Sequence, residues 1–199
     1  PLLAQRGVPG THDIELAVNT VKSLTSGIKT KITRFDKSMD DRISNQVEMS
    51  EGEIGVIVIE GWCFGAEPQF ENQLIAPVNE LERLKDPDGT CRRYINNALA
   101  TSYPKLFKMA HSTIMLRAPD FDSVFEWRLE QEKKLIEKLK LTHDGLVGMS
   151  VMSKEEIFEF IQSFQRITET CIERMPAKVN HLLQLDPQRD IIEYRTLNP

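Results

Sequence analysis

Apolar residues recur at helical spacing in several segments of the chain. The first segment runs from Ile14 to Leu24; Thr11 or Asp13 can cap its start, and Gly27 can end it. The same periodicity predicts four further helices, over residues 78–85, 92–110, 121–141 and 153–174. The last of these opens on the sequence SKEE, which is a capping box.

Short apolar runs alternate with these helices. The run 54–59, IGVIVI, is almost uninterrupted and rich in β-branched residues, which is typical of a strand buried on both faces in a parallel sheet. The polar stretch 35–45, FDKSMDDRISN, is typical of a loop. Further short strands are predicted over residues 31–34, 112–117, 181–185 and 191–195. Helices that alternate with short strands predict an α/β layered domain.

Composition and charge narrow the class of protein. The 199 residues suit one domain, with 40% hydrophobic and 28% charged residues and a net charge of -5. There is no basic excess to bind nucleic acid, and no apolar run approaches the ~18 residues of a membrane span. The three cysteines are far apart and form no CxxC pair. This spacing argues against a disulfide framework and predicts a reducing compartment, the cytoplasm.

Glu60 lies where the predicted strand 54–59 ends. In open α/β sheets, ligands bind beyond the carboxyl ends of the strands, and Gly61 would let a ligand approach the backbone closely. A carboxylate there is placed to hold a water of Mg²⁺ or to orient an attacking hydroxyl. It is equally an acid that simply ends a strand in solvent, and the strand pattern leaves both interpretations open.

Two polar segments near the N-terminus are candidates for substrate binding. The turn RGVPGTHD opens the first helix, where His12 and Asp13 are placed to contact a hydroxylated or anionic substrate. Arg34, Asp36 and Lys37 begin a run of charges that is suited to bind a phosphate, a carboxylate or Mg²⁺. From the residues alone, an ordinary capped loop and a solvated charged face explain the two segments as well.

The helix over 121–141 carries Arg128 and Glu132 at helical spacing. Mobile helical lids of phosphotransferases use arginines to clamp the transferring phosphate, so Arg128 is a candidate phosphate contact. The spacing alone favours the simpler interpretation, a helix with i,i+4 ion pairs such as Glu130 with Lys134.

The order of the motifs is more specific than any one of them. RGVPGTHD, RFDKSMDDR, VIVIEGWCFGAEPQ, PVNELERLKDPDG, LRAPDFDSVFEWRLEQEKKL and MSKEEIFEFIQSFQRITE together resemble the D-glycerate 3-kinase-like family of P-loop kinases. That family is related to the uridine kinase, pantothenate kinase and phosphoribulokinase group. The resemblance covers nearly the whole chain, and EGWCFGAEP and FEWRLEQE are its most specific parts.

The resemblance implies a fold and a reaction. The fold would be a three-layer α/β/α P-loop kinase fold with a mainly parallel sheet. The reaction would transfer the γ-phosphoryl of ATP, with Mg²⁺, to a hydroxyl of a small molecule, which is D-glycerate in glycerate kinases proper. By resemblance, Glu60 would be the catalytic, Walker-B-like acid. His12, Asp13, Arg34, Asp36 and Lys37 would line the acceptor pocket, and Arg128 would contact phosphate from a lid over about residues 120–150.

The sequence also departs from that family. The GxxxxGK[ST] loop that cradles phosphates and an Asp-Asp-Phe-Tyr segment do not occur in it. Residues 1–199 are therefore expected to form one domain equivalent to the C-terminal two thirds of such a kinase, incomplete at its N-terminus. A sheet without its first strand has an open edge, so we expect the isolated chain to be poorly stable or to self-associate. Two other functions stay open: a binding or regulatory protein without catalysis, and a P-loop kinase for another hydroxyl.

Overall fold

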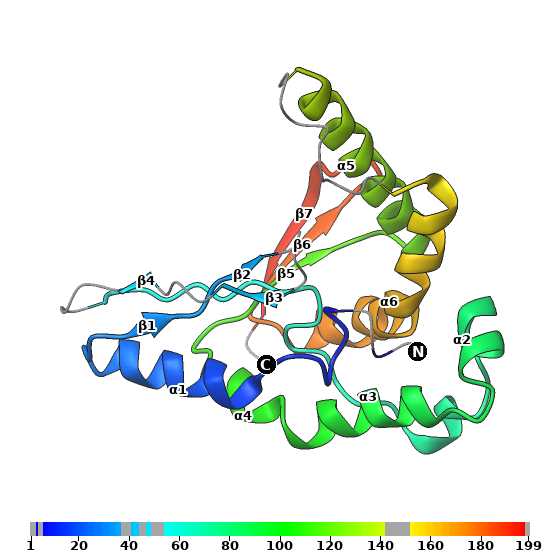
Figure 1. The fold of residues 1–199 in the computed structure, drawn as a ribbon. Coiled ribbons are helices and arrows are strands. Elements are labelled where there is room, and N and C mark those ends of the chain that lie inside the picture. Colours follow the sequence, from blue (N-terminus) through cyan, green and yellow to red (C-terminus); the bar gives the residue numbers. More distant parts are fainter. Residues whose placement is uncertain are drawn as a thin grey trace.

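The computed structural model describes residues 3, 6–36, 41–43, 47–48, 54–141 and 152–197. Six α-helices lie in these ranges (Figure 1): α1 (Ile14–Thr25), α2 (Glu80–Lys85), α3 (Thr90–Thr101), α4 (Pro104–Phe107), α5 (Phe121–Leu141) and α6 (Lys154–Arg174). Two short 3-10 turns accompany them, η2 (Glu71–Leu74) and η3 (Met175–Ala177). The helices are arranged around a small sheet, and the fold is therefore mixed α/β, as the alternation of patterns predicts.

The helix starts follow the capping signals in the sequence. The Asp13 carboxylate accepts a hydrogen bond from the Leu16 N–H at 2.9 Å and caps α1. At α6, Ser153 accepts from the Glu156 N–H, and the Glu156 carboxylate accepts from the Ser153 N–H in return, so the predicted capping box is confirmed.

One predicted helix is broken into two. The pattern predicts a single helix over residues 92–110, but α3 ends at Thr101 and α4 begins at Pro104. Proline has no backbone N–H and clashes with the preceding turn, so it starts a new helix rather than continuing the old one. Tyr103 lies at this junction, and α4 lies beside α1 (Figure 1).

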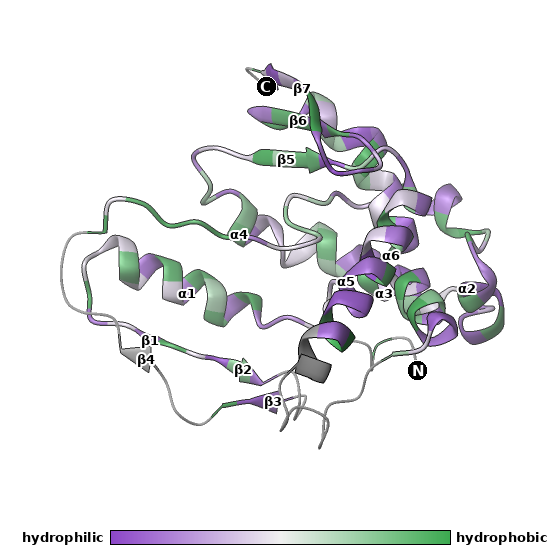
Figure 2. Cartoon of the chain, turned by 90° about the horizontal axis from the view of Figure 1, so that it is seen from above, coloured by the Kyte–Doolittle hydropathy of each residue, from purple (hydrophilic) through white to green (hydrophobic). Residues whose placement is uncertain are grey.

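The described sheet is smaller and less parallel than predicted. Strand β5 (Ile114–Arg117) pairs in parallel with β6 (His181–Leu185), and β6 pairs antiparallel with β7 (Ile191–Thr196). Figure 2 shows the three strands side by side with β6 between β5 and β7. Because the last connection is only a tight turn, β7 must return antiparallel to β6. The described residues therefore do not show the predicted three-layer fold with a mainly parallel sheet.

The prediction of a buried strand over residues 54–59 is wrong for this structure. Residues 54–60 pair with no strand, and Val56 and Val58 are 78% and 84% exposed. A strand needs a neighbour to satisfy its backbone groups and to cover its side chains. The described residues provide none here, so the segment stays extended and bare.

The described residues between 31 and 48 form two short antiparallel pairs of strands. Strand β1 (Lys31–Ile32) pairs with β4 (Val47–Glu48), and β2 (Phe35–Asp36) pairs with β3 (Asp41–Arg42). The stretch 35–45 was expected to be a loop, and its described part instead contains a two-residue ladder, with the Ile43 N–H donating to the Arg34 carbonyl at 2.8 Å. Two-residue strands leave no periodicity in a sequence, because alternation needs at least four residues to be seen.

The main core lies among α1, α3, α4 and α6 and the turn that follows residue 60. It is formed by Ile14, Val18, Cys63, Ala66, Ala98, Leu99, Tyr103, Leu106, Ile167 and Cys171. One smaller cluster joins η3 to the covered face of the sheet through Leu182, and another joins α5 to α6 through Ile161. The N-terminal turn and residue 60 therefore connect to the same packed centre.

Candidate functional site

The turn over residues 6–13 has a fixed shape. The Thr11 hydroxyl donates to the Val8 carbonyl at 2.7 Å and accepts from the Gly7 N–H at 3.2 Å, and Val8 is almost fully buried. Gly10 has φ +95, and a Cβ there would lie 2.6 Å from the ring of Tyr94. Only glycine fits this position, so the second glycine of RGVPGTHD is required by the turn itself.

His12 is hydrogen-bonded to Tyr103, a residue far away in the sequence. Its Nδ1 lies 2.6 Å from the phenol oxygen of Tyr103, which also accepts a hydrogen bond from the Gly10 N–H at 2.9 Å. Partial burial lowers the pKa of His12. Nothing in the sequence indicates that Tyr103 belongs to this site, because the contact spans 91 residues.

The short hairpin β2–β3 lies against this turn. Arg42 Nη2 is 3.0 Å from the Asp13 carboxylate, and the Arg6 guanidinium lies 5.5 Å from the centre of the Phe35 ring. The Leu16 N–H, and after it Arg42, hold the pKa of Asp13 below its ordinary value. These contacts bring His12 and Asp13 next to the hairpin.

The predicted residues on the hairpin have different surroundings. Arg34 is exposed, and its guanidinium has no partner among the residues that the structure describes. Asp36 is half-buried. Lys37 lies outside the described residues. The turn and hairpin therefore bring Arg42 next to Asp13 and the neighbouring His12, while Arg34 lies one position before Phe35 on the same strand side of the hairpin.

Glu60 is exposed at the end of the bare segment. Within the described part of the chain its carboxylate makes no hydrogen bond or ion pair. The residues after it are well anchored: the Trp62 indole N–H donates to the Thr168 hydroxyl at 2.8 Å, and Cys63 is buried in the main core. Glu60 is thus held at its C-terminal side only.

Arg128 is engaged within its own helix. Its guanidinium is 2.7 Å from the carboxylate of Glu132 and lies over the ring of Phe160. Glu132 is 3% exposed and also accepts from the Met152 N–H at 2.9 Å, so it joins α5 to the residues before α6. Lys134 pairs with Glu130 as the spacing indicates. To reach a phosphate, Arg128 would have to leave Glu132.

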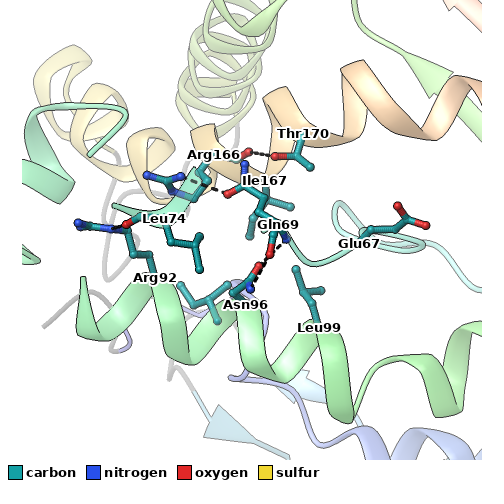
Figure 3. Close-up of a pocket in the computed structure, with 10 residues that line it drawn as sticks. Glu67, Gln69, Leu74, Arg92, Asn96, Leu99, Arg166, Ile167 and Thr170 are labelled. Carbon is teal, nitrogen blue, oxygen red and sulfur yellow. Dashed lines mark hydrogen bonds between the residues drawn. The ribbon is translucent and has the colours of Figure 1, made fainter. Parts of the chain in front are cut away.

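A small pocket lies between α3 and α6 (Figure 3). Two buried arginines dominate its wall: Arg92 donates to the Leu74 carbonyl and pairs with Asp86, and Arg166 pairs with Glu82. Arg166 also donates to the carbonyls of Gln73 and Ala76 at 2.8 and 2.7 Å. Since these arginines bind backbone carbonyls and carboxylates of the chain itself, they hold the segment before α2 in place.

The described residues include no group of three or more His, Cys, Asp or Glu side chains that could hold a metal ion. None of the described helices is both long and apolar enough to cross a membrane. Cys63 and Cys171 are free, and burial raises the pKa of each thiol to about 12. Neither thiol is therefore a nucleophile at neutral pH.

Comparison with known proteins gives distant kinase relatives. No family model matches the sequence. The chain is 28% identical over 172 residues to the chloroplastic D-glycerate 3-kinase of Arabidopsis thaliana, a match that covers 82% of this chain and 33% of that protein. It is 27% identical to the uncharacterized kinase mug58 of Schizosaccharomyces pombe and 23% to the probable ATP-dependent kinase TDA10 of Saccharomyces cerevisiae. These matches cover 58% and 54% of the two yeast proteins.

A solved structure has the same fold. It is the D-glycerate 3-kinase from Cryptococcus neoformans, with a TM-score of 0.77 and 24% identity over 99% of this chain and 71% of that one. The chain thus spans between a third and three fifths of the length of the curated relatives that it matches.

Proposed function

Because this chain is a distant homologue of D-glycerate 3-kinase and related kinases over most of its length, we propose that it forms part of an ATP-dependent small-molecule kinase. The proposed reaction transfers the γ-phosphoryl of ATP to a hydroxyl of the acceptor, with D-glycerate as the first candidate. The observation that carries the proposal is the match to D-glycerate 3-kinase of Arabidopsis thaliana over 82% of the chain. We further propose that residues 1–199 form one domain in a three-layer P-loop kinase fold, with a lid-like region over about residues 120–150.

The acceptor site in this proposal is the turn together with the hairpin β2–β3. His12 and Arg34 would bind the oxygens of the acceptor, Asp13 would keep Arg42 in place, and Asp36 and Lys37 would complete the pocket. A phosphoryl transfer needs positioning and neutralisation of charge more than covalent chemistry from the protein, so a rigid polar pocket of this kind is suited to it. Arg128 is proposed to contact the phosphates once it is released from Glu132.

Glu60 fits the metal that this reaction needs. Proteins commonly hold Mg²⁺ with one or two carboxylates, and phosphate oxygens and water complete its shell. The exposed Glu60 carboxylate, which has no partner among the described residues, is available for this role directly or through a water. ATP and Mg²⁺ together would supply the phosphoryl group and neutralise its charge. Glu60 would hold the ion or orient the acceptor hydroxyl.

A second function is supported by the absence of a GxxxxGK[ST] motif from these 199 residues. On this alternative the chain binds an acceptor without transferring phosphate. The acceptor itself is a further alternative, because another small hydroxyl compound would use the same reaction. For localisation we propose the cytoplasm, since free cysteines are typical of reducing compartments.

The test is a panel of hydroxyl acceptors with MgATP, using the protein at its full natural length. D-glycerate is expected to give stoichiometric ADP and a phosphorylated product in mass spectrometry. Glu60→Gln is expected to lower kcat by about 10²–10⁴-fold, and the exposed Glu159→Gln serves as its matched control. Binding of D-glycerate by calorimetry without ADP release would favour the second function. If only a different acceptor is turned over, that acceptor replaces D-glycerate in the proposal. If the protein neither binds nor turns over any acceptor of the panel, the proposal is refuted.

A further inference from the structure

Tyr103 is a rigid support that reaches the candidate site from the core. Tyr103 is only 4% exposed and belongs to the same core cluster as Ile14, Leu99 and Leu106. The ring of Phe107 meets it edge to face, with centres 5.7 Å apart. The phenol oxygen nevertheless extends to the N-terminal turn, where it contacts Gly10 and His12.

The two contacts constrain where the hydrogens lie. The Gly10 N–H can only donate, so the phenol oxygen of Tyr103 must accept at that side. The single hydrogen of this buried phenol also needs an acceptor, and the acceptor that the described residues offer is the Nδ1 of His12 at 2.6 Å. A neutral imidazole that accepts at Nδ1 carries its own hydrogen on Nε2. Among the described residues Nε2 has no hydrogen-bond partner, and the side chain of His12, although partly desolvated, lies at the surface.

We propose that Tyr103 is a positioning residue that fixes His12 in the Nε2–H tautomer, so that His12 presents a hydrogen-bond donor to an oxygen of the bound acceptor. The statement that an acceptor oxygen binds this donor rests on the proposed function. The tautomer of His12 is independent of the proposed function, because it is inferred from contacts within the chain. In this arrangement His12 takes no proton from the acceptor hydroxyl, since its only free ring nitrogen already carries one. The base of the reaction must be another group.

The surrounding charges are compatible with a neutral His12. Asp13 is the nearest carboxylate in the sequence, and its charge is met by the Leu16 N–H and by Arg42. On the other side, the Tyr94 hydroxyl donates to the Gly10 carbonyl at 3.4 Å and does not contact His12. Partial burial lowers the pKa of His12, which also favours the neutral ring.

The first test is ¹⁵N NMR of the histidine rings at neutral pH, with His12→Gln used to assign the His12 signals among the four histidines. In the unmodified chain, we expect Nδ1 to be unprotonated and hydrogen-bonded and Nε2 to be protonated. Tyr103→Phe keeps the ring in the core and removes the hydroxyl. It should shift the Nδ1 signal to that of an unprotonated nitrogen that accepts no hydrogen bond. It should also raise the pKa of His12, because a hydrogen bond that favours the neutral ring is lost.

Tyr94→Phe is the matched control, because it removes a hydroxyl that is bonded to the same glycine and should leave the His12 signals unchanged. A hydrogen on Nδ1 in the unmodified chain would overturn the proposal, and this measurement needs no variant to fold. Unchanged His12 signals in a folded Tyr103→Phe variant would overturn it as well.

The second test uses acceptor kinetics of the full-length protein. Tyr103→Phe should raise the KM for the acceptor about tenfold and leave kcat and the KM for ATP within about twofold, because it weakens binding of the ground and transition states alike. His12→Gln keeps an N–H donor that does not titrate, and its KM should stay within about threefold of the unmodified value; His12→Leu should raise KM at least as much as Tyr103→Phe. Loss of kcat in His12→Gln would identify His12 as a base and overturn the proposal. If no acceptor is turned over at all, the proposed function fails, while the NMR result still decides the tautomer.

Discussion

The turn at residues 6–13 and the segment at residues 54–60 are both predicted parts of one site, but they are held in very different ways. The turn is fixed by Tyr103 from the core and by Arg42 from the hairpin, together with its own internal hydrogen bonds. The segment has no neighbouring strand among the described residues, and its side chains Val56, Val58 and Ile59 are exposed. The chain alone therefore builds the acceptor side of the proposed site but leaves the strand that carries Glu60 unsupported.

The turn and the segment differ because one depends on local partners and the other on a distant partner. A turn and a helix cap are satisfied by residues a few positions apart, whereas a strand is satisfied only by another strand. This chain covers 71% of the Cryptococcus neoformans kinase, so that protein has residues without a counterpart in this chain. The lack of a neighbouring strand among the described residues explains why the most strand-like sequence is not a strand in this structure.

The largest expected effect comes from adding one methyl group at a glycine of each region. Gly10→Ala places a Cβ at φ +95 and 2.6 Å from the ring of Tyr94, and should cost about 2–4 kcal/mol of unfolding free energy. Gly61→Ala meets nothing within 4 Å, and its cost should stay within about 0.5 kcal/mol. Urea unfolding of both variants measures this. Equal costs would show that the turn is no more fixed than the segment.

A second comparison uses the same truncation in both regions. Val8 is 1% exposed, so Val8→Ala should destabilise the chain by about 1–3 kcal/mol. Val58 is exposed, and Val58→Ala should change stability by less than about 0.5 kcal/mol. In the full-length protein, Val58→Ala should become as costly as Val8→Ala if a neighbouring strand covers the segment there. A Val58→Ala cost that stays near zero at full length would contradict that explanation.

The sequence predicted the locally determined features and missed those that depend on distant contacts. Asp13 and Ser153 announce the starts of α1 and α6, because a cap and its partner are three residues apart. Tyr103 could not be assigned to the site, since it meets His12 across 91 residues. Arg128 has a local partner, Glu132, of the i,i+4 kind that its spacing favoured. Its role toward phosphate stays a prediction.

Exposed apolar residues on the sheet and on the segment should make the isolated chain associate with itself. Ile114 and Leu116 on β5 are 67% and 64% exposed. The double variant Val58→Lys with Leu116→Lys should weaken self-association at least about tenfold, or about 1.4 kcal/mol, in sedimentation experiments. Asn19→Lys with Asn97→Lys adds the same charge at exposed helix positions as a control. A chain that stays monomeric, with a sharp melt that does not depend on concentration, would contradict this prediction.

The smallest effect should be the pH dependence contributed by Asp13, the residue that joins the turn to the hairpin. Its pKa is lowered in the folded chain by the Leu16 N–H first and by Arg42 second. The charged form therefore contributes stability above the pKa of the unfolded chain, near ~3.9, and this contribution is lost as the pH falls through the lower folded pKa. Asp13→Asn keeps a good helix cap and removes the charge, so it should be less stable than the unmodified chain at neutral pH. That difference should begin to shrink as the pH falls below about 4 and should continue to shrink through the lower folded pKa, as measured by urea unfolding between about pH 7 and pH 2. Arg42→Gln should remove only part of the difference, because the Leu16 N–H remains. Parallel stability curves for Asp13→Asn and the unmodified chain at every pH would show that the charge of Asp13 does not hold the turn to the hairpin. The hydrogen bonds of Tyr103 and of Thr11 would then be what distinguishes this region from the bare segment.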